Sequence, residues 1–160
     1  MKLNKIRLEN IRSYKFQEID FPKGSVLLWG NIGSGKSSVL LGVDFALFGL
    51  TRGILSGGSL LRNGAKEGGV ELHLDINGKE IVIRRNLKRN EKSVTQDSGY
   101  ILTNGAKEEG SAVELKAKVL ELLNYPKDLL TKSKSLIYRF TVYTPQEEMK
   151  SILLEDAEER

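Results

Sequence analysis

The sequence contains no cysteine and only one histidine, His73. Disulfide bonds and thiolate metal sites are therefore excluded within these 160 residues, and so is a metal site built from several histidines. No apolar run approaches the roughly 20 residues that a membrane-spanning helix needs. The first residues alternate in polarity and lack the apolar block of a signal peptide. We therefore expect a cytoplasmic protein that begins at or near Met1 and has no membrane partner.

The composition is ordinary for a soluble globular domain, with 39% hydrophobic and 29% charged residues. The length favours one domain with a sizeable core. The net charge of +4 is unevenly spread, because five basic residues lie in the segment 84–92 and six acidic residues lie in 147–160. This asymmetry suggests a surface that faces a polyanion and a separate, solvated helix.

The order of the expected elements predicts a mixed α/β fold. Alternating apolar residues predict strands near the N-terminus and over 14–21. The apolar run 25–29 is typical of a buried central strand. Residues 37–48 are apolar around most of the helical surface, which predicts a helix buried between layers. The glycine-rich stretch 49–69 is expected to be irregular.

A β-hairpin is predicted where the segments 70–76 and 80–85 flank Asn77-Gly78, since this dipeptide suits a two-residue type I′ turn. A further strand is expected over 99–103.

Two capping boxes mark helix starts in the last third of the chain, one from Ser111 to Glu114 and one from Thr144 to Glu147. Between them, the apolar residues 136–142 predict another buried strand. We divide the chain into an N-terminal lobe over 1–146 and the start of a further helix over 147–160. That helix has no stop pattern, so we expect it to continue toward a coiled coil.

The most informative pattern is a P-loop, G-x-x-x-x-G-K-S, between a predicted strand and a predicted helix. Its glycines let backbone N–H groups point at phosphate oxygens, and the helix N-terminus adds its dipole. Lys36 would reach the β- and γ-phosphates of ATP, and Ser37 would ligate Mg²⁺. A glycine-rich turn with a chance lysine does not account for the flanking elements. The residues are Gly30, Asn31, Ile32, Gly33, Ser34, Gly35, Lys36 and Ser37.

Three further segments resemble the heads of SMC-like ATPases. Residues 10–14 resemble the Asn-Phe-Arg-Ser-His element before the P-loop, 45–49 resemble the end of the first helix, and 143–149 resemble the Q-loop. Together they are similar to the SbcC-type, Rad-fifty family of DNA double-strand-break repair ATPases, over nearly the whole chain. Tyr14 stands where the family usually has histidine, and Glu147 stands where glycine is common.

The resemblance implies a P-loop ABC-type ATPase head lobe, with a mixed sheet that has an antiparallel portion. It implies that Arg12 and Ser13 contact nucleotide phosphates and that Ser38 flanks the α-phosphate. Gln146 would contact Mg²⁺ or the attacking water. Alternatively, Arg12 is a solvated loop charge and Gln146 an ordinary first-turn residue. The full nucleotide set expected here is Arg12, Ser13, Asn31, Gly33, Ser34, Gly35, Lys36, Ser37 and Ser38.

The same resemblance implies the partners. They are the C-terminal lobe of the same ATPase, a second head that dimerises with ATP, an SbcD-type or Mre-eleven nuclease, and double-stranded DNA. A candidate DNA-backbone surface is formed by Arg85, Lys88, Arg89 and Lys92. A solvated hairpin explains these charges equally well.

Two segments imitate motifs that the resemblance assigns to the C-terminal lobe. Residues 55–59, Leu-Ser-Gly-Gly-Ser, mimic the signature motif but lie too close to the P-loop, so we interpret them as a coincidence. Residues 152–156 mimic a Walker B motif, yet their helical spacing indicates a helix face. We therefore expect an ATPase that is inactive without its C-terminal lobe.

Two other functions stay open. An SMC or RecF-type head would organise chromosomes or mediate recombination with little catalysis of its own. A small-molecule P-loop kinase is disfavoured, because it needs an acceptor site and an arginine-rich lid that the sequence does not show.

Overall fold

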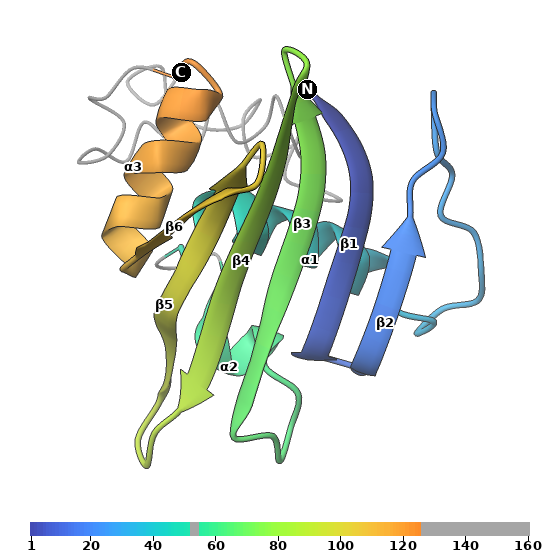
Figure 1. Cartoon of the computed structure of the whole chain (residues 1–160). Coiled ribbons are helices and arrows are strands. Elements are labelled where there is room, and N and C mark those ends of the chain that lie inside the picture. Colours follow the sequence, from blue (N-terminus) through green and yellow to red (C-terminus); the bar gives the residue numbers. More distant parts are fainter. Residues whose placement is uncertain (52–54, 126–160) are drawn as a thin grey trace, which may run out of the picture. The chain divides into compact units, whose positions relative to one another are not determined.

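The computed structural model describes residues 1–51 and 55–125, and residues 1–125 form one compact unit (Figure 1). The expected strand 136–142, the helix after Thr144 and the candidate Gln146 lie outside the described residues. The elements in chain order are β1 (Lys2–Ile11), β2 (Tyr14–Asp20), α1 (Lys36–Phe48), α2 (Gly57–Leu60), β3 (Glu67–Ile76), β4 (Lys79–Arg89), β5 (Val94–Thr103), β6 (Ala106–Gly110) and α3 (Ala112–Leu122).

The strands form a six-stranded sheet in the order β2-β1-β3-β4-β5-β6, and every neighbouring pair is antiparallel. The predicted α/β class with an antiparallel β portion is therefore confirmed. Asn77 and Gly78 connect β3 to β4 with φ angles of 53° and 78°, as a type I′ turn requires. Asn104 and Gly105 repeat this geometry before β6, a strand that was not predicted.

Helix α1 lies across one face of the sheet (Figure 1). Alternation along the strands turns a row of aliphatic side chains toward it, and these residues are buried. Gly42 brings the helix close to β1, because a Cβ atom there would lie 2.7 Å from the side chain of Leu8. Helix α3 packs on β5 and β6, and the predicted capping box between Ser111 and Glu114 is present.

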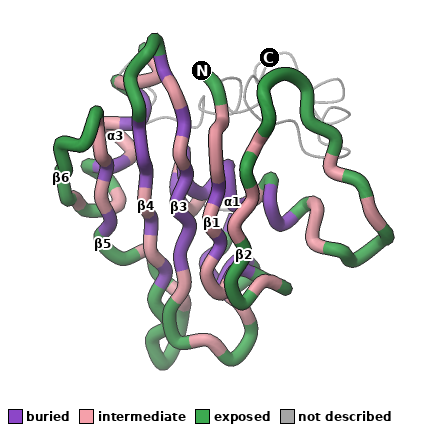
Figure 2. The backbone as a smooth tube through the Cα atoms, turned by 45° about the vertical axis from the view of Figure 1, so that its right-hand side comes forward, coloured by how far each residue is buried: buried purple, intermediate pink, exposed green. Residues whose placement is uncertain are grey.

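The expected buried strand at 25–29 is wrong for the described residues. The segment has no regular secondary structure and pairs with no described strand, and Figure 2 draws it as largely exposed. Leu27 is 84% exposed and Trp29 is 90% exposed. A central strand needs a neighbour on each side. The strand that leads into this region is β2, which lies at the edge of the described sheet and pairs there only with β1, and no other described strand is placed to pair with 25–29.

No helix in the described part of the chain has the length and apolar character to cross a membrane.

Candidate functional site

The P-loop connects the exposed segment 25–29 to helix α1, and its glycines adopt left-handed backbone conformations. Gly33 and Gly35 have φ angles of 82° and 93°. At Gly35 the lack of a side chain is also a packing requirement, because a Cβ atom would lie 2.6 Å from the hydroxyl of Tyr14. That hydroxyl donates to the carbonyl oxygen of Ser34 at 3.4 Å. The start of β2 thus supports the loop from one side.

The N-terminus of α1 is free of the groups that usually neutralise it. Gly35 is the N-cap, no side chain caps the helix, and the first turn contains no acidic residue. The backbone N–H groups at a helix start have no intrahelical partner, and the helix dipole places partial positive charge there. This end of α1 is therefore suited to an anion.

The ammonium group of Lys36 forms hydrogen bonds with other residues of the P-loop. It donates to the carbonyl oxygens of Gly30 at 2.8 Å and Asn31 at 2.7 Å, and it lies 3.3 Å from the hydroxyl of Ser34. These contacts hold one positive charge against the loop backbone and place the predicted residues Asn31 and Ser34 beside it.

A hollow of about 330 Å³ lies between the P-loop and the turn that joins β1 to β2. The structure therefore brings Arg12 and Ser13 beside P-loop residues that follow them by 20 or more positions in the sequence, while their contact with nucleotide phosphates stays a prediction. The other predicted residue beside the first turn, Ser38, takes part as well, although most of its surface is buried. The hollow is lined by Arg12, Ser13, Gly33, Gly35, Lys36, Ser37 and Ser38.

The turn that carries Arg12 is held by a residue that sequence reasoning missed. Arg62 donates from Nη1 to the carbonyl oxygen of Ser13 at 2.7 Å and to that of Arg12 at 3.2 Å. The N–H of Arg12 in turn donates to the carbonyl oxygen of Leu60 at 2.9 Å. The sequence hint was a basic residue directly after the apolar pair Leu60-Leu61, in a stretch expected to be irregular.

The candidate DNA surface needs a correction at Arg85, which is fully buried. Its guanidinium donates to the carbonyl oxygens of Ala46 at 2.7 Å and Leu47 at 3.1 Å, at the end of α1. Burial lowers its pKa to about 10. Arg85 is on the core side of β4 and cannot contact a DNA backbone.

The other three residues of the candidate DNA surface, Lys88, Arg89 and Lys92, are exposed. Arg89 donates to the carbonyl oxygens of Ala65 at 2.9 Å and Arg62 at 3.5 Å, so part of its guanidinium is already committed. The ammonium groups of Lys88 and Lys92 form no hydrogen bond or ion pair with any residue that the structure describes.

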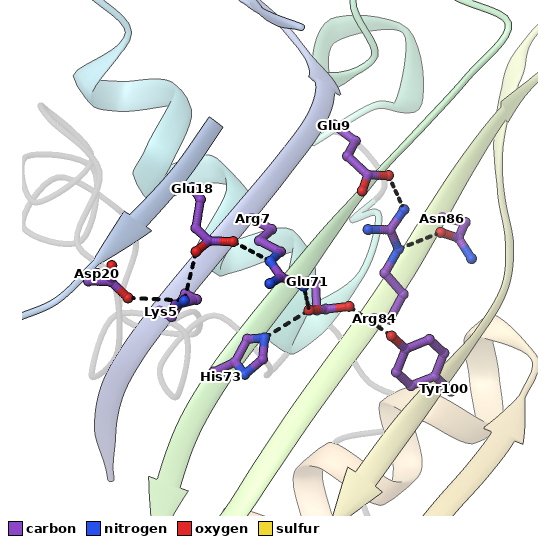
Figure 3. Close-up of polar contacts among 10 residues, drawn as sticks. All are labelled: Lys5, Arg7, Glu9, Glu18, Asp20, Glu71, His73, Arg84, Asn86 and Tyr100. Carbon is purple, nitrogen blue, oxygen red and sulfur yellow. Dashed lines mark hydrogen bonds and ion pairs between the residues drawn. The ribbon is translucent and has the colours of Figure 1, made fainter. Parts of the chain in front are cut away.

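The face of the sheet opposite α1 carries a polar network that was not predicted (Figure 3). Glu18 on β2 accepts hydrogen bonds from Lys5, at 2.7 Å, and from Arg7. These two bonds lower the pKa of Glu18 to about 2. The network links β1 and β2, the strands that lead into and out of the Arg12 turn.

A second part of this network centres on Glu71 of β3. Burial raises the pKa of Glu71, but hydrogen bonds with Tyr100 at 2.7 Å and His73 at 2.8 Å outweigh burial, and the pKa is lowered. Arg7 lies 3.2 Å from the same carboxylate. The carboxylate is therefore an ionised acceptor that ties three strands together.

The segment 55–59 has a local structural role. Ser56 is the N-cap of α2, and its hydroxyl accepts from the N–H of Ser59 at 3.1 Å. Gly57 is packed so tightly that a Cβ atom would lie 2.4 Å from the carbonyl oxygen of Val94. Helix capping thus accounts for Ser56, and tight packing accounts for Gly57, in the segment that resembles a signature motif.

The AAA domain family matches residues 5–160 of the chain. A protein of Thermoplasma acidophilum named DNA double-strand break repair Rad50 ATPase is 31% identical over 161 residues, which cover all of this chain and 17% of that protein. A protein of the same name from Methanococcus maripaludis is 34% identical over 77% of this chain and 12% of its own length. The chain therefore spans a small part of the relatives it matches.

Among solved structures, the recombination mediator protein RecF bound to ATP superposes with a TM-score of 0.53. The alignment covers 71% of this chain and 29% of that protein, with 20% sequence identity. At this identity the likeness shows the fold alone.

Proposed function

The chain belongs to the AAA domain family, as the N-terminal lobe of a Rad50/SbcC-type ATPase, and on this premise we propose that it binds ATP with Mg²⁺ for a DNA double-strand-break repair ATPase. ATP binding would drive two heads together so that they clamp DNA and regulate a partner nuclease. The setting would be the cytoplasm, at the nucleoid.

The observation that carries the proposal is the convergence of two separate segments on one hollow. The P-loop contributes Lys36 and the uncapped N-terminus of α1, and the β1–β2 turn contributes Arg12 and Ser13. Two cationic side chains and a helix dipole then face one space of about 330 Å³. A triphosphate is the ligand that such a concentration of positive charge favours.

Lys36 has a defined task in this proposal. Its ammonium is held by two loop carbonyls and one hydroxyl, so it is already positioned when a phosphate arrives. Because all three acceptors are neutral, exchanging one of them for a phosphate oxygen gives a stronger, charge-assisted bond.

The residues around the hollow fit a magnesium ion in part. Ser37 offers an oxygen ligand beside Lys36, and Mg²⁺ is commonly held by a few protein oxygens together with substrate phosphates and water. No carboxylate is among the described residues that line the hollow. We propose that Gln146 and an acidic residue of the C-terminal lobe complete the metal site.

The exposed apolar segment 25–29 supports the proposed C-terminal lobe. Leu27 and Trp29 lie next to the P-loop and are largely exposed among the described residues. Such residues are usually buried, and an added lobe that supplies strand neighbours would cover them.

The RecF-type alternative shares the nucleotide site and differs in the partner. It predicts ATP-dependent dimerisation without regulation of a nuclease.

Titration of the chain with ATP and Mg²⁺ in a calorimeter tests the nucleotide site. We expect saturable binding that Lys36→Ala weakens by at least tenfold, since a charge-assisted bond contributes about 1.5–3 kcal/mol. Lys23→Ala, an exposed lysine outside the hollow, is the matched control. Equal binding by the two variants would refute the proposed site.

A further inference from the structure

Arg62 stands behind the phosphate-binding turn and not in the hollow. It does not line the hollow that Arg12 and Ser13 face. Its Nη1 carries two hydrogens, and the two acceptors are the carbonyl oxygens of Ser13 at 2.7 Å and Arg12 at 3.2 Å. A single nitrogen thus satisfies two consecutive carbonyls of the turn.

The turn needs such support because its backbone is unusual. Asn10 and Arg12 both have positive φ angles, of 50° and 49°. A non-glycine residue in the left-handed region costs on the order of 1–3 kcal/mol and persists only where its surroundings fix it. The conformation of Arg12 is therefore determined by its contacts and not by its own preference.

Residues 60–62 provide those contacts along the whole turn. The N–H of Arg62 donates to the carbonyl oxygen of Asn10 at 2.8 Å, and the N–H of Arg12 donates to that of Leu60 at 2.9 Å. Ile11 forms a bridge with Leu61 between them. The backbone bonds fix the start of the turn, and the Arg62 side chain reaches its far end at Ser13.

The segment that carries Arg62 is itself anchored to β4. Arg89 donates from Nε to the carbonyl oxygen of Ala65 at 2.9 Å, and its N–H donates to that of Lys66 at 2.7 Å. The loop after Arg62 therefore has a fixed attachment to the sheet, and Arg62 transmits that rigidity to the turn.

We propose that Arg62 is a positioning residue that holds Arg12 and Ser13 in place to bind nucleotide phosphates. The proposal rests on the proposed function of the hollow. Arg62 acts through the two carbonyls and makes no contact with the nucleotide. Without its guanidinium the turn keeps its backbone bridge to Leu61, but Ser13 loses its anchor and Arg12 leaves the left-handed region.

Binding of ATP to the full chain tests this role in three variants and the wild type. We expect Arg62→Ala to weaken ATP binding about tenfold, because the two carbonyl bonds that position the turn are lost. Arg62→Lys keeps a cation with several donors and should remain within about threefold of wild type. Lys66→Ala, an exposed residue on the same loop whose side chain has no role in the turn, is the control.

A double-mutant cycle separates positioning from direct contact. If Arg62 acts through Arg12, the loss caused by Arg62→Ala should shrink to less than about threefold in an Arg12→Ala background. If the double variant loses ATP affinity by the full product of the two single losses, the proposal is overturned, since Arg62 would then act on the nucleotide independently of Arg12.

Hydrogen exchange of peptides that cover residues 10–14 gives a readout that needs no nucleotide. We expect exchange about tenfold faster in Arg62→Ala than in wild type or Lys66→Ala, at equal global stability. Unchanged exchange would overturn the proposal whatever the binding result. If wild type binds no ATP but exchange still rises, Arg62 holds the turn and the proposed function of the hollow is what fails.

Discussion

Arg85 Nε donates to the carbonyl oxygen of Ala46 at 2.7 Å, so a buried guanidinium caps the C-terminal end of the P-loop helix. The helix dipole places partial negative charge at this end and partial positive charge at the Gly35 end. The cation is therefore in a favourable field, and it satisfies carbonyls that have no intrahelical donor. Helix α1 is thus fixed at one end by Arg85 while its other end faces the hollow that we propose binds phosphates.

We predict that Arg85→Met destabilises the chain by about 2–4 kcal/mol. Methionine fills much of the volume, but the carbonyls of Ala46 and Leu47 lose their donor in a buried site. Urea unfolding followed by circular dichroism measures the change. Lys88→Met, an exposed position on the same strand, is the control and should change stability by less than about 0.5 kcal/mol. A similar small effect at both positions would show that the buried cap is not needed.

The burial of Arg85 could have been predicted from the sequence. The cluster of basic residues in 84–92 led instead to the prediction that this segment is a basic surface. Ile81, Ile83 and Leu87 occupy every second position of β4 and face the core, and Arg85 falls on the same alternation. The strand period was a stronger constraint than residue type. Arg84 is on the other face, where it pairs with Glu9.

The strand expected at 25–29 could not be excluded in this way. Its apolar run is typical of a buried strand. Apolar composition does not reveal, however, which segment or chain supplies the neighbouring strands. The helix after the P-loop, by contrast, was predictable and begins at Lys36, and the loop glycines have the positive φ angles that such a turn requires. Arg62 was missed because its role depends on a long-range turn contact that leaves no periodic pattern in the sequence.

We predict that Lys88→Ala combined with Lys92→Ala weakens binding to all DNA sequences alike. If both lysines contact phosphates, the slope of log affinity against log salt should shrink by about 1.8, at roughly 0.9 for each contact. Fluorescence anisotropy with two duplexes of unrelated sequence measures this slope. Lys79→Ala, at the opposite end of the same strand, should leave it unchanged. An unaltered slope in the double variant would mean that this segment is only a solvated hairpin.

The pKa of Glu18 predicts how the β1–β2 pair responds to acid. Its folded pKa of about 2 lies below the ordinary value of 4.5, so its stabilising effect is fully present above pH 4.5 and is lost as the pH falls toward 2. We therefore expect Glu18→Gln to lower the urea midpoint at neutral pH, and the gap from wild type should narrow steadily below about pH 4.5. In a Lys5→Met background the pH dependence of the gap should weaken, because one of the two bonds that lower the pKa is absent. A gap that is constant with pH would contradict the assigned network.

We predict that Lys36→Ala abolishes ATP-dependent association of heads. The variant loses the ammonium group that would pair with the phosphates. It also loses the three contacts that this ammonium makes within the P-loop. Light scattering with the matching C-terminal lobe present measures the association. Lys36→Arg keeps the charge but cannot place a compact ammonium between two carbonyls, so we expect it to restore little. Unchanged dimerisation of Lys36→Ala would remove the basis for a phosphate site here.

The last prediction is that residues 1–160 alone bind ATP weakly and hydrolyse it negligibly, and that a C-terminal lobe restores turnover. Phosphoryl transfer requires a positioned water and neutralisation of the charge that develops. The described hollow supplies cations and one hydroxyl for a metal, but its lining contains no acidic residue to orient water. The Ser56 hydroxyl, the best candidate for an internal signature contact, is engaged in capping α2. Single-turnover hydrolysis on the chain alone, and then with the lobe added, measures the difference. Sustained turnover by the chain alone that disappears in Ser56→Arg would mean that the segment 55–59 is a working signature motif. It would also overturn the proposal that hydrolysis needs the C-terminal lobe.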